Sequence, residues 1–203
     1  MDYKTYKNFD FEKISNEHNQ LINEIFSNLE SIKSQDIINE FSSSRAMKSI
    51  SKPLNSVIFE KFVNANWQSE KPILESSELL MLSTSKRWTL DFYKEGIGLE
   101  VAFDHGVGIA WNITKLFIAA NENNHKKAVN INVGVLITAD NQLRTKGGFD
   151  GSIGTFEQYV EHLKVFESIA KMNILIIGLG APSEFWIRHR KIGSKKIGKL
   201  REY

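Results

Sequence analysis

Cysteine is missing from this chain of 203 residues, and proline is scarce, with only three residues. The lack of cysteine excludes a disulfide framework, a thiolate metal site and a thiol nucleophile. No apolar run approaches the ~20 residues that a membrane-spanning helix needs, and the first residues, MDYKTYK, lack the apolar core of a signal peptide. We therefore expect a protein with no membrane segment, and these absences fit a reducing cytoplasm.

The composition is that of a globular domain. Hydrophobic residues make up 41% of the chain and charged residues 25%, which excludes a disordered chain, a collagen-like fibre and a pure coiled coil. A chain of this length has enough residues for one domain with a sizeable core, and too few for two comfortable ones. We expect one α/β domain over residues 1–187, followed by a short tail.

Hydrophobic periodicity predicts the order of helices and strands. A helical period predicts helices over 11–41 (one long helix or two collinear ones), 53–67, 109–120 and 156–169. Alternation and dense branched side chains predict strands over 88–93, 97–104, 131–138 and 174–179. This order is typical of a layered α/β fold, with a helical part at 1–70 and a core at 85–182. The glycine-rich segment 144–154 is predicted to be a mobile loop.

Two acidic residues lie on the predicted hairpin. Asp91 faces away from Leu90 and Phe92, and Glu100 shares a strand face with Asp104. Two carboxylates that lie close together repel each other, and a sheet partly removes both from water. Mg²⁺ relieves this conflict because it binds one or two carboxylates and keeps several waters. The alternative is that both acids lie on a solvated sheet face.

The same residues resemble a known family. Asp91, eight intervening residues and the run Glu100-Val-Ala-Phe103 are similar to the signature Asp-x8-Glu-Val-Gln-Phe of restriction endonucleases of the BglII and BstYI type. The resemblance covers roughly residues 40–182, and it implies the PD-(D/E)XK fold, in which helices flank a central mixed sheet. Outside the signature, the resemblance rests on Pro53, Asn55, Phe59 and Trp67 of one helix, the segment 152–158, and the strand 174–179.

The resemblance implies a type II restriction endonuclease. Such an enzyme hydrolyses double-stranded DNA at a short palindromic site, depends on Mg²⁺, leaves 5′-phosphate ends and acts as a homodimer. Asp91 and Glu100 would ligate the Mg²⁺, with the carbonyl of Val101 as a further ligand. The metal would activate a bound water and stabilise charge on the scissile phosphate.

The chain departs from the signature at its third position, where Ala102 replaces Gln of the family and Lys of the wider superfamily. A methyl group can neither orient nor activate a water. Nearby candidates for this function are Asp104, His105, Lys94 and Lys115, of which we favour His105 or Lys94. Otherwise the metal-bound water works unaided, or the chain is an inactive or weakened DNA-binding protein on the nuclease fold. A third possibility is an ordinary α/β protein with incidental carboxylates.

Two segments are expected to read bases, because the corresponding segments do so in the family that the chain resembles. The first is Asp104-His105, directly after the catalytic strand, and the second is the loop from Asp150 to Ser152. Their carboxylate, imidazole and hydroxyl groups supply the acceptors and donors that base readout uses. The alternative is that Asp104 and Asp150 only cap the following turns.

The end of the chain is strongly basic. Residues 188–203 carry seven basic residues and one acid, whereas the preceding residues have a net charge of −4. This asymmetry indicates an arm for a polyanion, and the alternative is a solvated, frayed terminus. The residues expected to bind DNA phosphates are Arg188, Arg190, Lys191, Lys195 and Lys196.

Overall fold

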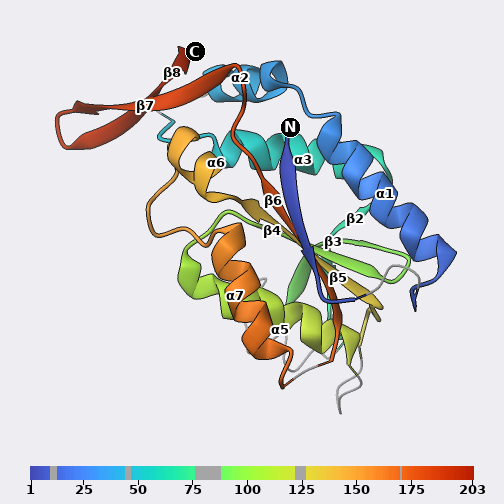
Figure 1. Ribbon diagram of the computed structural model, residues 1–203. Coiled ribbons are helices and arrows are strands. Elements are labelled where there is room, and N and C mark those ends of the chain that lie inside the picture. The colour runs from blue at the N-terminus through green and yellow to red at the C-terminus, as the bar shows by residue number, and fades with distance from the viewer. Residues whose placement is uncertain (10–12, 44–46, 76–87, 122–126, 170) are drawn as a thin grey trace.

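The computed structural model describes residues 1–9, 13–43, 47–75, 88–121, 127–169 and 171–203. Its main feature is a six-stranded sheet with helices on both faces (Figure 1). In chain order the elements are β1 (Tyr3–Lys7), α1 (Asn16–Glu30), α2 (Ser34–Ser43), α3 (Ser51–Asn64), β2 (Gln68–Pro72), β3 (Thr89–Lys94), β4 (Ile97–Ala102), the 3-10 helix η2 (Gly106–Gly108), α5 (Ile109–Ala120), β5 (Val133–Ala139), α6 (Asn141–Lys146), α7 (Phe156–Phe166), β6 (Asn173–Leu179), β7 (Phe185–Ile192) and β8 (Lys195–Glu202).

The sheet has the strand order β1-β6-β5-β4-β3-β2. The three central strands β4, β5 and β6 are parallel, and the connections between them contain helices, as parallel pairing requires. Every residue of β5 is buried, which explains its unbroken apolar sequence VGVLITA. The antiparallel strands β1, β2 and β3 complete the sheet. The prediction of a central mixed sheet flanked by helices is thereby confirmed.

Two apolar layers hold the helices against the sheet. Leu29 of α1, Ile37 of α2 and Phe62 of α3 pack on one face with Leu99 of β4. On the other face α5 and α7 form a second layer around buried Tyr159, and Figure 1 shows both helices on this side. Ala102 of β4 lies in this second layer, so the end of β4 faces α5 and α7.

Polar side chains define where several helices begin. The Ser15 side chain accepts a hydrogen bond from the His18 backbone N–H at the start of α1. Thr155 and Gln158 form a capping box at the start of α7. Pro53 lies in the first turn of α3, where its missing N–H has no intrahelical partner to lose. The prediction that a helix opens near Pro53 is confirmed.

The N-terminal helical part differs from the prediction in detail. The described part of the predicted stretch 11–41 contains two helices, α1 and α2, which are not collinear in Figure 1; residues 11 and 12 lie outside the described residues. The strands β1 and β2 were not predicted. Both lie at sheet edges and have polar sequences, YKTYK and QSEKP, because an edge strand can obtain its order from backbone pairing alone. Pro72 ends β2, a position that proline tolerates.

The predicted alternation of β3 is wrong at one point. Leu90 and Phe92 were expected on one face, but Leu90 packs in the layer of α5 and Phe92 in the layer of α3. The regular alternation of faces therefore breaks at Asp91, which lies between them. In β4 the expected alternation holds, because Ile97 and Leu99 face the layer of α3 and Ala102 faces the layer of α5.

The basic tail is a β-hairpin of β7 and β8, paired over eight residue pairs, so it is not a frayed terminus. The hairpin begins at Phe185, before the expected boundary, and Figure 1 shows it projecting from the body. Phe185 and Ile187 are buried and join the layer of α3. The longest helix is α1 with 15 residues, and among the described residues no helix has the length and apolar character to cross a bilayer.

Candidate active site

The site begins where β3 separates from β4. The two strands pair from Lys94↔Ile97 to Phe92↔Leu99, and beyond this point β3 still pairs with β2. The Asp91 carboxylate then accepts a hydrogen bond from the Val101 backbone N–H at 2.7 Å. A side chain thus takes the place of a backbone acceptor, and this bond holds the Asp91 carboxylate against β4.

Glu100 lies on β4, between β3 and β5, and its side chain is 3% exposed. Its Oε2 atom accepts a hydrogen bond from Lys115 Nζ of α5 at 2.5 Å. Its Oε1 atom is buried and has no hydrogen-bond partner among the residues that the structure describes. A buried carboxylate oxygen without a partner is rare and costly, which indicates that a ligand belongs there.

Burial and charge both act on this pair of carboxylates. Burial raises the pKa of Glu100 to about 8; the charge of Asp91 raises it as well, and the Lys115 ammonium opposes the shift. Burial also raises the pKa of Asp91, whereas the Val101 N–H and Lys115 lower it. Because each carboxylate disfavours the charge of the other, a bound cation would stabilise both.

The donor set fits a hard divalent cation such as Mg²⁺. The described residues contain no group of three or more His, Cys, Asp or Glu side chains arranged to hold a metal. Mg²⁺ does not require one, because it is usually bound by one or two carboxylates and retains several waters. Asp91 and Glu100 provide that number, and the unpartnered Oε1 atom of Glu100 provides a free acceptor.

A further acid, which the sequence did not single out, lies beside the pair. Glu70 of β2 is located between the pairs Ser69↔Phe92 and Lys71↔Leu90, so it runs alongside Asp91. Its charge raises the pKa of Asp91, and its backbone has φ of 49°, in the left-handed region. Such a conformation is uncommon outside glycine and occurs often at functional sites.

In the structure the two favoured basic candidates contact other residues than the carboxylate pair. Lys94 Nζ binds both carboxylate oxygens of Glu24, at 2.9 and 3.1 Å, and the Ala65 carbonyl at 2.8 Å. No described contact joins Lys94 or His105 to Asp91 or Glu100, and their catalytic roles stay predictions. Lys115, the third basic candidate, is the residue that contacts Glu100.

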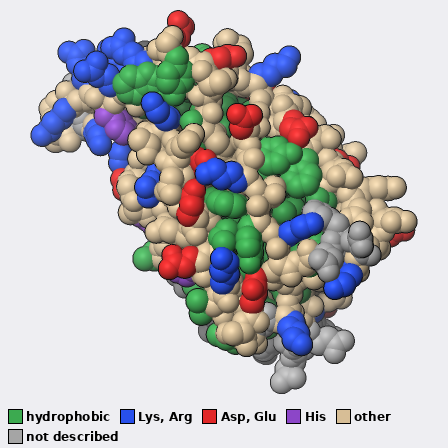
Figure 2. Space-filling view, in the orientation of Figure 1, with side chains coloured by type: hydrophobic (Ala, Val, Ile, Leu, Met, Phe, Trp, Pro, Cys, Tyr) green, Lys and Arg blue, Asp and Glu red, His purple; other side chains and the backbone are tan. Residues whose placement is uncertain are grey.

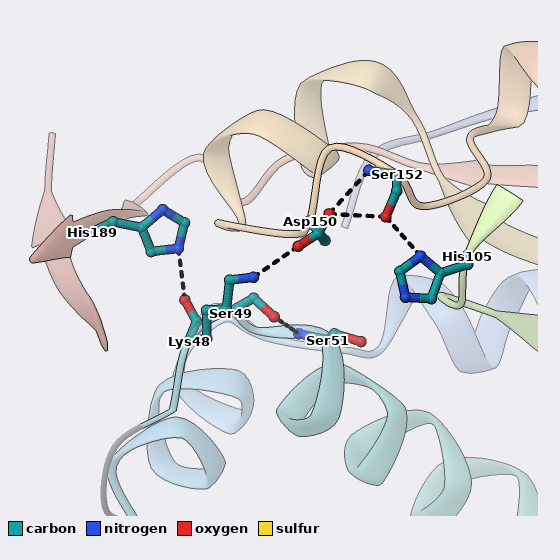
Figure 3. Close-up of polar contacts among 7 residues, drawn as sticks. All are labelled: Lys48, Ser49, Ser51, His105, Asp150, Ser152 and His189. Atoms are coloured by element: carbon teal, nitrogen blue, oxygen red, sulfur yellow. Dashed lines mark hydrogen bonds and ion pairs between the residues drawn. The ribbon is translucent and has the colours of Figure 1, made fainter. Parts of the chain in front are cut away.

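His105 instead belongs to a polar chain that links three segments (Figure 3). Lys48 Nζ lies 2.8 Å from Asp150 Oδ2, and Asp150 Oδ1 accepts hydrogen bonds from the Ser152 hydroxyl and backbone N–H. Because the single proton of the Ser152 hydroxyl is donated to Asp150, this hydroxyl accepts from Nδ1 of His105, at 2.6 Å. Hydrogen bonds from Lys48 and Ser152 lower the pKa of Asp150.

The loop of Asp150 and Ser152 is tied to the segment that follows the catalytic strand. Gly106 N–H donates to the Ser152 carbonyl at 2.7 Å, and Gly154 N–H donates to the Asp104 carbonyl at 3.0 Å. Part of the glycine-rich segment predicted as a mobile loop is therefore held by backbone pairing, and α6 occupies its beginning. The side chains of Asp104, His105, Asp150 and Ser152 are all exposed, as base-reading groups must be.

The hairpin of β7 and β8 lies next to this series of hydrogen-bonded residues, and it adds positive charge there. Its basic side chains gather at one end of the molecule in Figure 2. The register sets like charges opposite each other, Arg188↔Lys199 and Lys191↔Lys196, which is unfavourable without an anion. Arg190 is also exposed, and the side chain of Lys195 lies outside the described part of the structure.

Two contacts join the hairpin to Met47 and Lys48, which we call the Lys48 segment. His189 Nε2 donates to the Lys48 carbonyl at 2.9 Å, and Gly198 N–H donates to the Met47 carbonyl at 2.8 Å. Lys48 and His189 were not predicted from the sequence, since no local pattern marks them. The hairpin, the Lys48 segment and the loop of Asp150 thus form one continuous polar surface.

Comparison with solved structures identifies the fold. A crystal structure of restriction endonuclease BglII complexed with a DNA 16-mer is similar with a TM-score of 0.67 at 17% identity, and covers 100% of both chains. A crystal structure of free BglII has a TM-score of 0.56, with the same identity and coverage. At this identity the likeness shows a shared fold, that of a restriction endonuclease.

The family follows from a comparison with family models. The model for restriction endonuclease BglII/BglIII matches residues 5–179. The chain belongs to this family and is a type II site-specific deoxyribonuclease, as the resemblance of its signature implied. Comparison with curated protein sequences gives no match.

Proposed function

We propose that this deoxyribonuclease is a Mg²⁺-dependent enzyme that cuts both strands of DNA at a short palindromic site and leaves 5′-phosphate ends. The observation that carries the proposal is the pair of half-buried Asp91 and buried Glu100. Their charges disfavour each other, and no described residue is a hydrogen-bond partner of Glu100 Oε1. A divalent cation satisfies both conditions.

Each residue of the pair has a defined part in this proposal. Asp91 and Glu100 would hold the Mg²⁺ together with the Val101 carbonyl. When bound, Mg²⁺ lowers the pKa of a coordinated water and stabilises charge on the scissile phosphate. The Val101 N–H orients Asp91 and Lys115 orients Glu100, so both carboxylates are positioned before the metal arrives. The apolar layers around them exclude other water.

DNA would lie across the polar surface formed by the hairpin and the loop of Asp150. The similar BglII structure is a complex with DNA, which supports a DNA-binding face on this fold. We assign base reading to Asp104, His105, Asp150 and Ser152. The exposed basic side chains of the hairpin would bind phosphates, in a hollow of about 350 Å³ lined by Arg188, His189, Arg190, Lys199 and Arg201.

A palindromic site implies a symmetric enzyme. Each half-site offers the same surface, so a two-fold dimer can bind both halves with the same residues. We therefore propose a homodimer, and a cytoplasmic location, where its DNA substrate would be found.

Incubation of the protein with plasmid DNA and Mg²⁺ tests the proposal. We expect discrete fragments whose ends can be ligated without prior phosphorylation by a kinase. No fragments should form when EDTA is present. Gel retardation without cleavage would instead support a DNA-binding protein that has lost catalysis, an alternative that Ala102 favours. The proposal would be overturned if several sequenced plasmids were neither retarded nor cleaved. Run-off sequencing of the fragments identifies the site.

A further inference from the structure

The missing third signature residue leaves a gap in the chemistry of the site. Ala102 follows Glu100 by two residues on β4, so both face α5 and α7. Its side chain is 2% exposed and packs with Ile109 and Ile113 of α5. This position therefore provides an apolar contact, and a polar group for the reaction must come from another element.

Lys115 of α5 is positioned to provide that group. Its ammonium lies 2.5 Å from Glu100 Oε2 and 3.3 Å from the Thr89 carbonyl, at the point where β3 separates from β4. Its side chain is 10% exposed. Placing an ammonium in an apolar layer is costly, and a purely structural contact between α5 and β4 does not require it. Its neighbours Ile113, Leu116 and Ala119 are all apolar.

The two oxygens of Glu100 have different surroundings. Oε2 is bound by Lys115, whereas Oε1 is buried and, within the described part of the chain, has no hydrogen-bond partner. A cation at Oε1 and the ammonium at Oε2 can therefore bind the same carboxylate together. If Glu100 holds a cation, the Lys115 ammonium would be available at the same carboxylate to contact the reacting groups.

We propose that Lys115 is a catalytic residue that replaces the third residue of the signature, from a helix instead of from the catalytic strand. This inference rests on the proposed function. The Lys115 ammonium donates hydrogen bonds to the attacking water and to a non-bridging phosphate oxygen. The water oxygen forms a bond to phosphorus and releases its proton to solvent. The bond from phosphorus to O3′ breaks, and O3′ keeps the electron pair and takes a proton from solvent.

The sharpest test moves the amine from position 115 to the signature position 102. We expect Lys115→Met, which keeps the length and removes the charge, to lower the cleavage rate at saturating Mg²⁺ at least a hundredfold. DNA binding measured with Ca²⁺ in place of Mg²⁺ should stay within threefold of wild type. The double variant Lys115→Met/Ala102→Lys should recover at least tenfold of the lost rate, because it returns an amine to the signature position. Lys127→Met is a matched control, since this lysine binds the carbonyls of Ala119 and Asn121 near the end of the same helix.

A structural role predicts other results. If Lys115 only neutralises Glu100, Lys115→Arg should cleave like wild type; if it contacts the reacting groups, the longer planar guanidinium should lower cleavage at least tenfold. The Arg variant decides the question if Lys115→Met fails to fold by circular dichroism. Wild-type rates in either folded variant would overturn the proposal for Lys115 alone. A wild-type protein that does not cleave would overturn the proposed function as well.

Discussion

Glu100 carries its charge in a place where that charge is unfavourable. Its side chain is 3% exposed, burial raises its pKa to about 8, and no described residue forms a hydrogen bond with its Oε1 atom. The ion pair with Lys115 only partly compensates, because a buried ion pair offsets its own desolvation only when its remaining lone pairs are also satisfied. A residue in this state is matched to a ligand that the protein alone does not provide.

Neutral, isosteric variants of the carboxylates test their role as metal ligands. Asp91→Asn can still accept the hydrogen bond from Val101, and Glu100→Gln keeps its shape, so we expect both variants to fold. Cleavage should fall at least about a hundredfold, since several kcal/mol of charge stabilisation depend on the metal and each ~1.4 kcal/mol is a factor of ten. Plasmid cleavage rates and DNA retardation measure the two effects. Cleavage by Asp91→Asn within tenfold of wild type would exclude its assignment.

Lys94 has contacts that predict a role in stability. It binds Glu24 and the Ala65 carbonyl, and its ammonium lies 5.9 Å from the ring centroid of Trp67. We expect Lys94→Met to lower the free energy of unfolding by about 0.5–1.5 kcal/mol, because its partly exposed partners lose their hydrogen bonds. The cleavage rate of the folded enzyme should change less than about twofold. Urea unfolding and cleavage assays measure these quantities, and a large rate loss at unchanged stability would support the catalytic role first favoured for Lys94.

Asp150 and Ser152 are the cleanest tests of base reading, since His105 is also a predicted catalytic candidate. Asp150→Ala and Ser152→Ala should relax discrimination against single-base variants of the cognate site by roughly ten- to hundredfold per lost contact. Competitive cleavage of cognate and variant duplexes measures this ratio. Ser168→Ala, whose hydroxyl binds only the nearby Val165 carbonyl among its described contacts, is a matched control. If cleavage falls equally on the cognate and variant duplexes, or does not fall on either, the loop has a structural role.

At the scale of elements, the hairpin of β7 and β8 combines an apolar base with a basic outer part. Phe185 and Ile187 are buried against the body, whereas the basic side chains beyond them are exposed. Deletion of residues 188–203 would therefore remove β8 and expose this base. Replacing the basic side chains with neutral ones tests DNA binding without removing β8.

We expect the variant with glutamine at Arg188, Arg190, Lys199 and Arg201 to bind DNA with a weaker salt dependence. Each lost phosphate contact should reduce the slope of log K against log salt by about 0.9, and the cut site should not change. Titrations at several salt concentrations measure the slope. Lys164→Gln on α7 serves as the control. A slope equal to that of wild type would mean that the hairpin does not bind phosphates.

At the scale of the whole molecule, the sheet separates two layers and brings the functional groups to one edge. The carboxylate pair lies where β3 and β4 separate, and the segment after β4 pairs with the loop of Asp150. That loop contacts Lys48, whose carbonyl binds the hairpin. Cleavage, base reading and phosphate binding are thus assigned to adjacent parts of one surface.

A two-fold enzyme should be measurable as a dimer. Sedimentation velocity at micromolar concentration should give twice the chain mass of 23.2 kDa, with or without a duplex that contains the site. The reason is that two identical half-sites require two identical surfaces. A single chain on the cleaved duplex, with both strands cut, would contradict this expectation.

The local pattern of the sequence predicted a large part of this protein. Alternation and helical spacing depend on neighbours within one or two turns, so the core strands, α3, α5 and α7 could be predicted from residue order. The spacing of Asp91 and Glu100 on adjacent strands of a hairpin is equally local, and their signature led to the correct family. The edge strands β1 and β2 escaped prediction because their order comes from backbone pairing with partners distant in sequence.

Only the tertiary structure decided which distant groups meet. Lys94 is nearer to Asp91 in sequence than Lys115 is, yet Lys115 contacts the site, because packing of α5 on β4 brings its ammonium to Glu100 fifteen residues away. Lys48 and Asp150 are 102 residues apart and form an ion pair through the layer arrangement. Periodicity specifies the face on which a side chain lies, whereas its partners depend on how those faces pack. For that reason the sequence alone determined the carboxylate pair, and the fold determined the cation beside it.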